Sequence, residues 1–386
     1  MRVLHFVETF SRLSQTFIFD YIRELDRQGS DSHVLTLKRE NEQERPYSKV
    51  HIVELPPRWN RQRTWRKFKL TVTGRRNTPL DIWWLRRIGI SRSIRKLRPT
   101  VIHAHFGQMG VRIAPLARRH RIPLVVTFYG YDASGVPRDP AWFVRYQDLW
   151  PQASAVVVLS ERMKERVLEL GCPASKVHIV RIGKRLEEYP FRLPSRPVRH
   201  LISVGRLVEK KGHLDLIDAV GQLHAEGVDL EVSIIGEGPL RGLLEERIRA
   251  HGLEGRVTLL GAMAHAQVIQ HMRAADAFVL TSKTAENGDQ EGTPTVLLEA
   301  QAMGLPCVST WHAGIPEQIP EGSHWLLAAE GDVPGIADRI RALARCGIDE
   351  LEALAVAGRR QVESMYEIGD RARQLSDLYR QVSRAP

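Results

Sequence analysis

Short apolar runs rich in β-branched residues alternate with segments of helical period along most of the chain. This alternation is typical of parallel sheets covered by helices on both faces. In the first half, strands are expected at 3–7, 33–37, 50–54, 101–105, 124–128 and 155–160. In the second half, they are expected at 200–205, 230–235, 256–261, 277–282 and 306–310. Helices are expected near the end at 333–344, 350–362 and 368–382. The pattern predicts an α/β protein with two doubly wound, Rossmann-like halves.

A proline-bearing gap with little periodicity separates the two sets of strands. It carries Pro190, Pro194 and Pro197. Such a gap is typical of an interdomain linker. We expect an N-terminal domain at 1–183, a linker at 184–199 and a C-terminal domain at 200–367. Two such domains would face each other across a central cleft, and open α/β sheets bind ligands beyond the carboxyl ends of their strands.

The most informative segment is 290–300, which follows one of the predicted strands. Thr293 is a suitable N-cap and Pro294 fits the first position of a helix. The free N–H groups of Thr295 and Val296 would then form an anion site suited to a phosphate or diphosphate.

Two carboxylates flank this predicted helix start. Glu291 lies in the loop before it, and Glu299 lies more than one turn inside it. The pair could reach different hydroxyls of one extended ligand. In the alternative interpretation, Glu291 only complements the helix dipole and Glu299 is a solvated helix residue.

A second loop suited to an anion runs from Gly205 to Gly212, after the strand expected at 200–205. It presents Arg206 and Lys211. A guanidinium and an ammonium on one turn can neutralise a diphosphate leaving group in place of a divalent metal.

Together these segments resemble the donor site of the retaining family 4 glycosyltransferases, which have the GT-B fold. The resemblance rests on Gly205-Arg206-Leu207 with Lys211-Gly212, and on Glu291 and Glu299 with seven residues between them. It extends over nearly the whole chain through the segments 13–18 (LSQTFI), 102–107 (IHAHFG), 126–132 (VTFYGYD), 236–240 (GEGPL), 299–306 (EAQAMGLP) and 313–317 (AGIPE). Within the family, it is nearest to transferases that build bacterial exopolysaccharide, capsule and lipopolysaccharide.

The resemblance implies roles for individual residues of the donor site. Arg206 and Lys211 would hold the nucleotide diphosphate, Glu299 the ribose hydroxyls, and Glu291 hydroxyls of the donor sugar. The backbone from Gly292 through Thr293 and Pro294 to Thr295 would cover the phosphates and the sugar. The C-terminal domain would bind this donor.

The resemblance also implies the reaction. A sugar would move from a nucleotide diphosphate sugar to a saccharide or lipid-linked acceptor, as in a hexosyltransferase, with retention and with the leaving phosphate helping to deprotonate the acceptor. We expect no cofactor and no metal, since no aspartate-rich metal motif stands out. His103 and His105 have no cysteine or histidine cluster at zinc-ligand spacing beside them.

The N-terminal domain would bind the acceptor, and the helix at about 368–383 would pack back onto that domain. Its candidate residues, which line the acceptor or sugar side, are Ser14, Gln15, His105, Tyr129 and Asp132. Tyr129 stands where many relatives have histidine. Lys184 and Arg185 replace an aliphatic residue and an aspartate in the linker, and the sequence offers no account of this change.

The charge of the chain is concentrated in one segment. The protein has a formal charge of +11, but residues 58–98 hold 14 basic residues and one acidic residue, so the remainder sums to −2. Tryptophans interleave with these cations, which suits either stacking on nucleic acid or an anionic membrane interface. With the resemblance, we favour a membrane patch at Arg61, Arg63, Trp65, Arg66 and Lys67, and expect no nucleic acid. An ordinary packed helix with solvated arginines is the alternative.

The cysteine content and the distribution of apolar residues bear on where the protein acts. Three scattered cysteines, no signal-peptide pattern and no run of 18 apolar residues favour a cytoplasmic protein, peripheral on the inner face of the membrane. The alternative functions are a nucleotide-sugar epimerase or hydrolase of the same architecture, and a nucleic-acid-binding module that uses residues 58–98.

Overall fold

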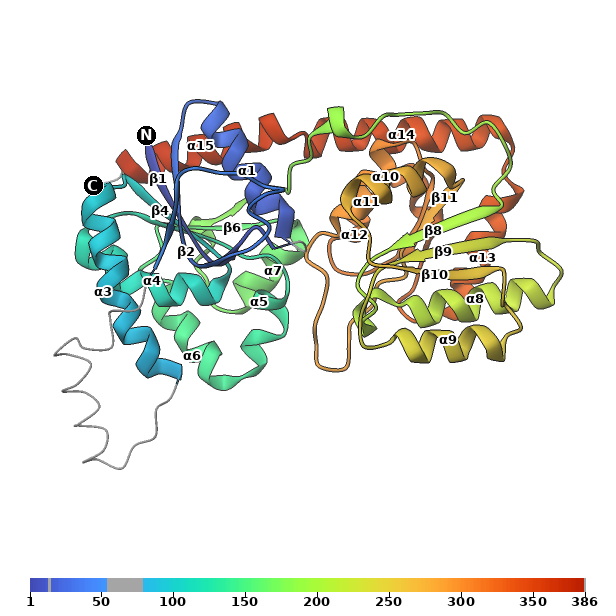
Figure 1. Cartoon of the computed structure of the whole chain (residues 1–386), viewed down its shortest axis with the longest axis horizontal. Coiled ribbons are helices and arrows are strands. Elements are labelled where there is room, and N and C mark those ends of the chain that lie inside the picture. The colour runs from blue at the N-terminus through green and yellow to red at the C-terminus, as the bar shows by residue number, and fades with distance from the viewer. Residues whose placement is uncertain (13–14, 54–78, 385–386) are drawn as a thin grey trace.

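Two parallel sheets, one in each half of the chain, form the frame of the protein (Figure 1). The computed structural model describes residues 1–12, 15–53 and 79–384. Each sheet is covered by helices on both faces, which confirms the predicted pair of Rossmann-like domains.

The N-terminal sheet has the order β3-β2-β1-β4-β5-β6-β7. Its strands are β1 (Arg2–Phe10), β2 (Asp31–Arg39), β3 (Val50–Ile52), β4 (Val101–His105), β5 (Leu124–Thr127), β6 (Ala155–Val158) and β7 (Val177–Ile179). Its helices are α1 (Thr16–Arg27), α3 (Pro79–Leu97), α4 (Gly107–His120), α5 (Tyr131–Ser134), α6 (Pro140–Leu149) and α7 (Glu161–Glu169).

The C-terminal sheet has the order β10-β9-β8-β11-β12-β13. Its strands are β8 (His200–Val204), β9 (Glu231–Ile235), β10 (Val257–Gly261), β11 (Ala277–Val279), β12 (Cys307–Thr310) and β13 (Leu327–Ala328). The helices are α8 (His213–Ala225), α9 (Arg241–Ala250), α10 (His265–Ala274), α11 (Thr295–Ala302), α12 (Ile315–Gln318), α13 (Val333–Arg345), α14 (Ile348–Tyr366) and α15 (Ile368–Arg384).

Each strand expected from the pattern has a counterpart in the structure. Two further strands, β7 and β13, are not predicted by the pattern; they have three and two residues and close one edge of each sheet. Runs this short carry too little alternation to be recognised.

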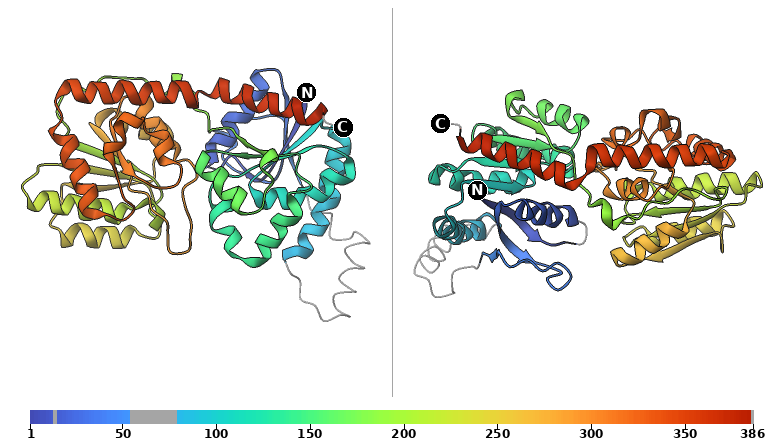
Figure 2. Two further views of the ribbon diagram at one scale, coloured as in Figure 1. Left: turned by 180° about the vertical axis from the view of Figure 1, so that it is seen from behind. Right: turned by 90° about the horizontal axis from the view of Figure 1, so that it is seen from above.

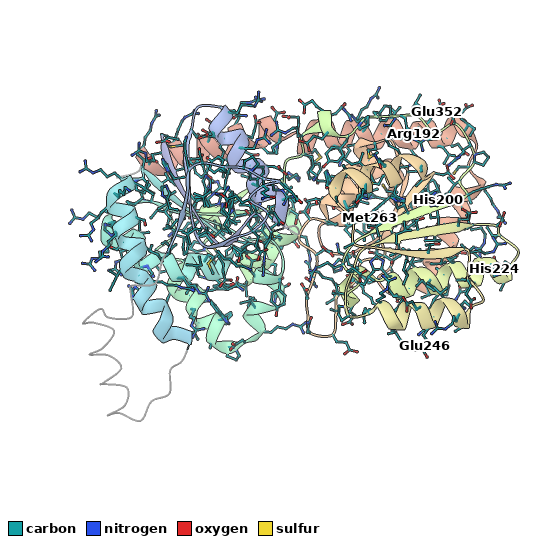
Figure 3. All side chains as sticks on the ribbon, in the orientation of Figure 1. Arg192, His200, His224, Glu246, Met263 and Glu352 are labelled. Carbon is teal, nitrogen blue, oxygen red and sulfur yellow. The ribbon has the colours of Figure 1, made fainter. Side chains whose placement is uncertain are left out.

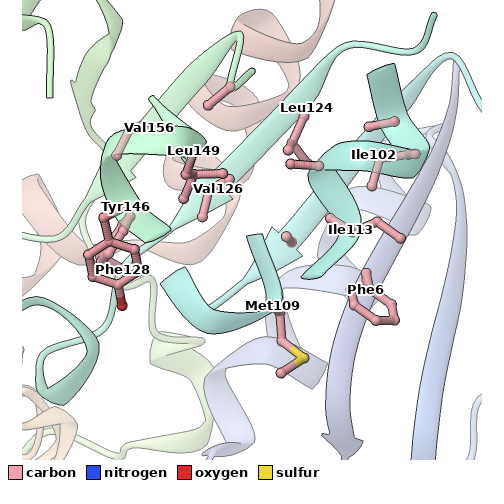
Figure 4. Close-up of a cluster of buried hydrophobic side chains, with 14 of the residues drawn as sticks. Phe6, Ile102, Met109, Ile113, Leu124, Val126, Phe128, Tyr146, Leu149 and Val156 are labelled. Atoms are coloured by element: carbon pink, nitrogen blue, oxygen red, sulfur yellow. The ribbon is translucent and has the colours of Figure 1, made fainter. Parts of the chain in front are cut away.

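Apolar side chains fill the space between the N-terminal sheet and its covering helices. In Figure 4, Phe6, Ile102 and Val126 from three neighbouring strands meet Ile113 of α4 and Leu149 of α6. All five are at most 1% exposed. Burying each contributes roughly 1.5–3 kcal/mol, and this packing fixes the strand ends that carry the site.

The chain crosses between the domains a second time near its end. Helices α14 and α15 follow each other along one side of the molecule, seen from above in Figure 2. Helix α15 packs on the N-terminal domain, where Leu375 and Tyr379 share a buried cluster with Val3 of β1 and Tyr21 of α1. The N-terminal domain is therefore built from both ends of the chain.

Candidate functional site

The strands of the C-terminal sheet run toward the N-terminal domain. In Figure 3, Met263, just after β10, lies nearer that domain than His200 at the start of β8. The loops after β8 and β11 therefore face the N-terminal domain, as expected for a ligand site at the carboxyl ends of parallel strands.

Lys211 and Glu291 form a buried ion pair between these two loops. The Lys211 Nζ lies 2.9 Å from the Glu291 Oε1, and the side chains are only 12% and 9% exposed. Burial raises the pKa of Glu291, but the ammonium groups of Lys211 and Lys210 outweigh it and hold this pKa below its ordinary value. Glu291 is therefore a charged acceptor next to a cation suited to a phosphate.

Lys210 and Arg206 complete the cationic side of the site. Lys210 Nζ lies 2.9 Å from Asp289 and also donates to the Gln290 carbonyl, which ties the β8 loop to the β11 loop. Arg206 is exposed at the start of the β8 loop. The structure thus places Arg206 and Lys211 on one turn, with Lys211 directed at Glu291.

His312, which the sequence does not single out, is hydrogen-bonded to the backbone of Glu291. The backbone N–H of Glu291 donates to His312 Nε2 at 3.1 Å, and His312 Nδ1 lies 2.7 Å from Glu330. Burial raises the pKa of Glu330, but bonds from His312 and the Thr284 backbone lower it to about 2. His312 directly precedes the segment 313–317 and follows the strand predicted at 306–310. This position at a strand end is the sequence feature by which it could be recognised as a site residue.

The helix that carries Glu299, α11, begins one residue later than predicted. The local pattern predicts the N-cap at Thr293, whereas α11 starts at Thr295 with Pro294 at the cap position, and no side chain caps it. Thr293 is instead a buried residue of the preceding loop. The backbone N–H groups of Thr295 and Val296 still open the helix, so the helix start shifts by one residue while the N–H groups predicted for the anion site are unchanged.

Glu299 contacts a cation from the interdomain linker. Lys184 Nζ lies 2.5 Å from Glu299 Oε1, with the two side chains 5% and 9% exposed. Glu299 is thus a buried, ion-paired residue and not a solvated helix residue. Although burial lowers the pKa of Lys184, the Glu299 carboxylate raises it above its ordinary value.

The two domains touch where Gly130 meets Gly292. A Cβ at Gly292 would lie 1.8 Å from the Tyr129 carbonyl oxygen, and one at Gly130, where φ is +138°, would lie 2.7 Å from the Gly292 nitrogen. Only glycine permits this approach. The adjoining cavity has about 40 Å³ and is lined from both domains by residues that include Gly130, Ser134, Ser160, Arg162, Glu291 and Gly314.

That volume is far below the roughly 300 Å³ or more typical of small-molecule sites. The cleft is therefore closed at this point, so a ligand the size of a sugar can enter only after the domains have separated.

Asp132 organises the N-terminal side of the contact. Its carboxylate accepts hydrogen bonds of 2.9 Å from the backbone N–H groups of Gly107, Tyr129 and Gly130. It is 2% exposed. Asp132 is predicted on the acceptor or sugar side, whereas in the structure its carboxylate holds the turn that presents Tyr129 and Gly130.

His105 lies behind Tyr129. Its Nδ1 is 2.7 Å from the Tyr129 hydroxyl and its Nε2 is 3.2 Å from His5 Nδ1. Burial lowers the pKa of His105 well below its ordinary value, so the imidazole is neutral. The expected acceptor-side residue is therefore one layer removed from the cleft surface.

His103 joins His5 and His105 in a buried trio that the sequence analysis did not find, because His5 lies on another strand. One ligand atom from each lies within 4.8 Å of the others, and in the described part of the chain no other group of this kind occurs. His103 bonds Tyr379 on Nδ1 and Thr127 on Nε2. His5 and His105 direct nitrogens at each other, whereas His103 contacts them only through its ring and bonds residues outside the trio.

The other predicted residues lie apart from this centre. Gln15 is the N-cap residue of α1, with no side-chain capping bond. Ser14 and the predicted patch at Arg61, Arg63, Trp65, Arg66 and Lys67 lie outside the described residues. Among the described helices, none combines the length and apolar character needed to cross a membrane.

A cationic groove lies between α3 and α4. Ser91 Oγ and His120 Nε2, 2.8 Å apart, join the two helices. The groove has about 470 Å³, and Arg87, Arg95 and Arg119 line it. It extends the basic character of residues 58–98 onto the neighbouring helix.

Comparison with protein families matches both domains. Residues 187–361 match Glycosyl transferases group 1, and residues 14–183 match the Glycosyl transferase 4-like domain. The two matches cover the C-terminal and N-terminal sheets.

Known proteins give the same assignment. WcaL, the glycosyltransferase assigned to colanic acid biosynthesis in Escherichia coli K12, is 34% identical over 69% of this chain and 66% of its own length. The amylovoran biosynthesis glycosyltransferase AmsK of Erwinia amylovora is 33% identical over 71% of this chain and 68% of its own. Anabaena HepE, solved with UDP and glucose, has the same fold, with a TM-score of 0.77 at 19% identity over 99% of this chain and 100% of its own.

Proposed function

This chain belongs to the glycosyl transferases of group 1 and is a GT-B glycosyltransferase, and on that premise we propose that it transfers a sugar, with retention, from a nucleoside diphosphate sugar to a saccharide or lipid-linked acceptor. The names of WcaL and AmsK support a role in cell-surface polysaccharide biosynthesis.

The observation that carries this proposal is the buried Lys211–Glu291 ion pair near the N-terminus of α11. A diphosphate placed beside Lys211 gains a buried cation, the N–H groups that open α11, and Arg206 at the rim. Glu291, held charged, accepts hydrogen bonds from the sugar hydroxyls. Glu299 accepts from the ribose through its carboxylate.

Negative charge develops on the diphosphate as it leaves, and the site must stabilise this charge. Lys211 and Arg206 stabilise that charge as the glycosidic bond breaks. The leaving phosphate oxygen takes the proton of the acceptor hydroxyl, which attacks from the same face and gives retention. These cations perform the electrostatic task that a divalent ion performs elsewhere, so we propose a metal-independent reaction that needs no bound cofactor.

We further propose that the acceptor reaches the N-terminal domain from an anionic membrane surface. The arginine-lined groove between α3 and α4 supports this, because clustered cations are attracted to anionic lipid by about 1 kcal/mol each. The protein would then be cytoplasmic and peripheral on the inner face of the membrane.

Screening UDP-, GDP- and ADP-sugars for thermal stabilisation and consumption tests the donor assignment. At least one should stabilise the wild-type protein and be consumed when acceptor is present, and Lys211→Ala should abolish both effects. If none shifts the melting temperature or is consumed, the assignment is wrong. Sugar release without acceptor at the rate of transfer would indicate a hydrolase.

The stereochemistry and the metal requirement are tested on the active pair. Proton NMR of the first product should show the anomeric configuration of the donor. Activity should survive EDTA, and restoration of a lost activity by Mn²⁺ would contradict the metal-independent proposal.

A further inference from the structure

Lys184 stands where the two crossings between the domains meet. Its backbone N–H donates to the Tyr366 carbonyl at 2.6 Å, and its own carbonyl accepts from the Ile368 N–H at 3.1 Å. At the preceding Gly183, a Cβ would lie 2.6 Å from the Ile368 Cα. The linker and the α14–α15 junction are thus bound to each other here, and we call residues 183–184 and 366–368 the hinge.

The Lys184 side chain leaves the hinge and enters the donor site. Its ammonium lies 2.5 Å from Glu299 Oε1 and 5.4 Å from the centre of the Tyr189 ring. The Lys184 charge also acts electrostatically on Asp20 of α1, in the N-terminal domain. The cation is therefore paired with a carboxylate of the C-terminal domain and within electrostatic influence of one in the N-terminal domain.

Stability alone is a poor reason for such a pair. Taking both charges out of water costs several kcal/mol per ion, and a buried pair adds little net stability compared with apolar side chains. What the pair does provide is orientation: the ammonium fixes one carboxylate oxygen in place.

The other oxygen of Glu299 is available. A carboxylate offers about four lone-pair directions, and in the described part of the chain nothing is bonded to Oε2. A ribose hydroxyl that donates to Oε2 would meet an acceptor whose position Lys184 has already set, so less ordering is needed on binding.

We propose that Lys184 is a positioning residue of the donor site, which holds the Glu299 carboxylate at the hinge so that it is oriented for the ribose hydroxyls of the nucleotide. The inference rests on the proposed function, since it requires a nucleoside diphosphate next to Glu299. It explains why a lysine occupies a linker position where an aliphatic residue was expected.

Calorimetric titration with two ligands tests it. The ligands are the nucleoside diphosphate that the wild-type protein binds, UDP or GDP, and its 2′,3′-dideoxy form. Lys184→Met keeps the length of the side chain and removes its charge. The dissociation constant for the ribose form should rise roughly tenfold, because a charge-assisted hydrogen bond is weakened, while that for the dideoxy form should stay within about twofold.

Comparing the two ligands within one variant removes effects of partial misfolding, since these weaken both equally. Lys184→Arg should restore most of the affinity for the ribose form. Arg185→Met is the matched control, because Arg185 contacts Glu24 and Glu188 and not Glu299, and it should bind both ligands as the wild type does.

Equal weakening of both ligands by Lys184→Met would make the role structural and overturn the proposal, and so would no weakening of either. If the wild-type protein binds neither UDP nor GDP, the donor assignment itself fails. The two failures are therefore distinguishable.

Discussion

Glu317 of the C-terminal domain accepts a hydrogen bond of 3.0 Å from the backbone N–H of Glu161 in the N-terminal domain. The same carboxylate accepts from the Arg162 N–H at 3.1 Å and lies 3.2 Å from the Arg181 guanidinium. An anion at the first turn of α7 is favoured by the helix dipole. Glu317 therefore fastens the domains in the closed arrangement.

Glu317→Ala should make closure less favourable. We expect kcat/KM to fall roughly tenfold, since charge-assisted bonds contribute about 1.5–3 kcal/mol, while UDP affinity changes little because the donor loops lie on one domain. Steady-state kinetics and titration measure the two effects. Glu321→Ala, an exposed neighbour, is the control, and a variant with normal turnover would show that Glu317 does not control closure.

Gly292→Ala should block the contact between the domains. The added methyl group would meet the Tyr129 carbonyl oxygen, so the cleft cannot close to the observed geometry. We expect kcat to fall by about 100-fold or more, because misplacement by about 1 Å has this effect. Gly322→Ala, where a Cβ meets nothing within 4 Å, is the matched control. Normal kcat in Gly292→Ala would mean that catalysis does not need this closed form.

Lys211 and Glu291 should respond in opposite directions to free nucleotide. Lys211→Met removes the phosphate partner, and UDP affinity should fall roughly tenfold. Glu291→Gln releases Lys211 from its present partner, so UDP should bind at least as tightly, while turnover falls because the sugar hydroxyls lose a charged acceptor. Calorimetric titration with UDP and steady-state kinetics on both variants measure these two effects separately. Equal loss of UDP affinity in both would contradict the separate roles.

The buried histidines should make folding stability depend on pH. Burial lowers the pKa of His103 to about 3, against about 6.5 in the unfolded chain. Between these values the unfolded state binds the extra proton, so stability is fully present above pH 6.5 and falls as the pH drops toward 3, by up to about 1.4 kcal/mol per pH unit for this group.

Urea denaturation at pH 7.5, 5.5 and 4.5 measures this dependence. His103→Gln keeps a hydrogen-bonding side chain but removes the titration, so its stability should fall less between pH 7.5 and 5.5. Equal losses in the two proteins would show that His103 is not the responsible group.

Charge reversal in the α3–α4 groove should weaken attachment to anionic lipid. Arg95→Glu with Arg119→Glu should reduce sedimentation with phosphatidylglycerol vesicles roughly tenfold or more, and neutralising Arg61, Arg63, Arg66 and Lys67 should do the same. UDP affinity should not change. Arg249→Glu, at an exposed position on α9, is the control. If the groove variant bound vesicles as well as the wild type, the groove arginines would be solvated surface residues with no role in lipid binding.

Much of the fold could be predicted because its signals are local. Strands such as Leu124–Thr127 (LVVT) and Ala155–Val158 (AVVV) are short runs rich in β-branched residues, and the predicted helix at 368–382 has an amphipathic repeat. The cap of α11 was misplaced because Thr293 and Pro294 satisfy local preferences, while in the structure Thr293 is buried in the preceding loop.

The donor-side residues could be selected from motif spacing, but their pairing could not. Lys184 and Glu299 are 115 positions apart, and His5 and His105 are 100 apart. Asp132 has a charged side chain and follows a strand, as a ligand-binding residue often does. In the structure, however, its carboxylate accepts hydrogen bonds from three backbone N–H groups of the protein. Such roles depend on the tertiary arrangement, which a linear pattern does not contain.

The position of α15 has a consequence for biosynthesis. The ribosome releases the strands of the N-terminal sheet long before Leu375 and Tyr379, which cover one side of that sheet. The nascent N-terminal domain therefore keeps an uncovered apolar face until α15 has been synthesised. Termination before α15 should leave one chain in which the C-terminal domain has its core intact and the N-terminal domain recruits chaperones.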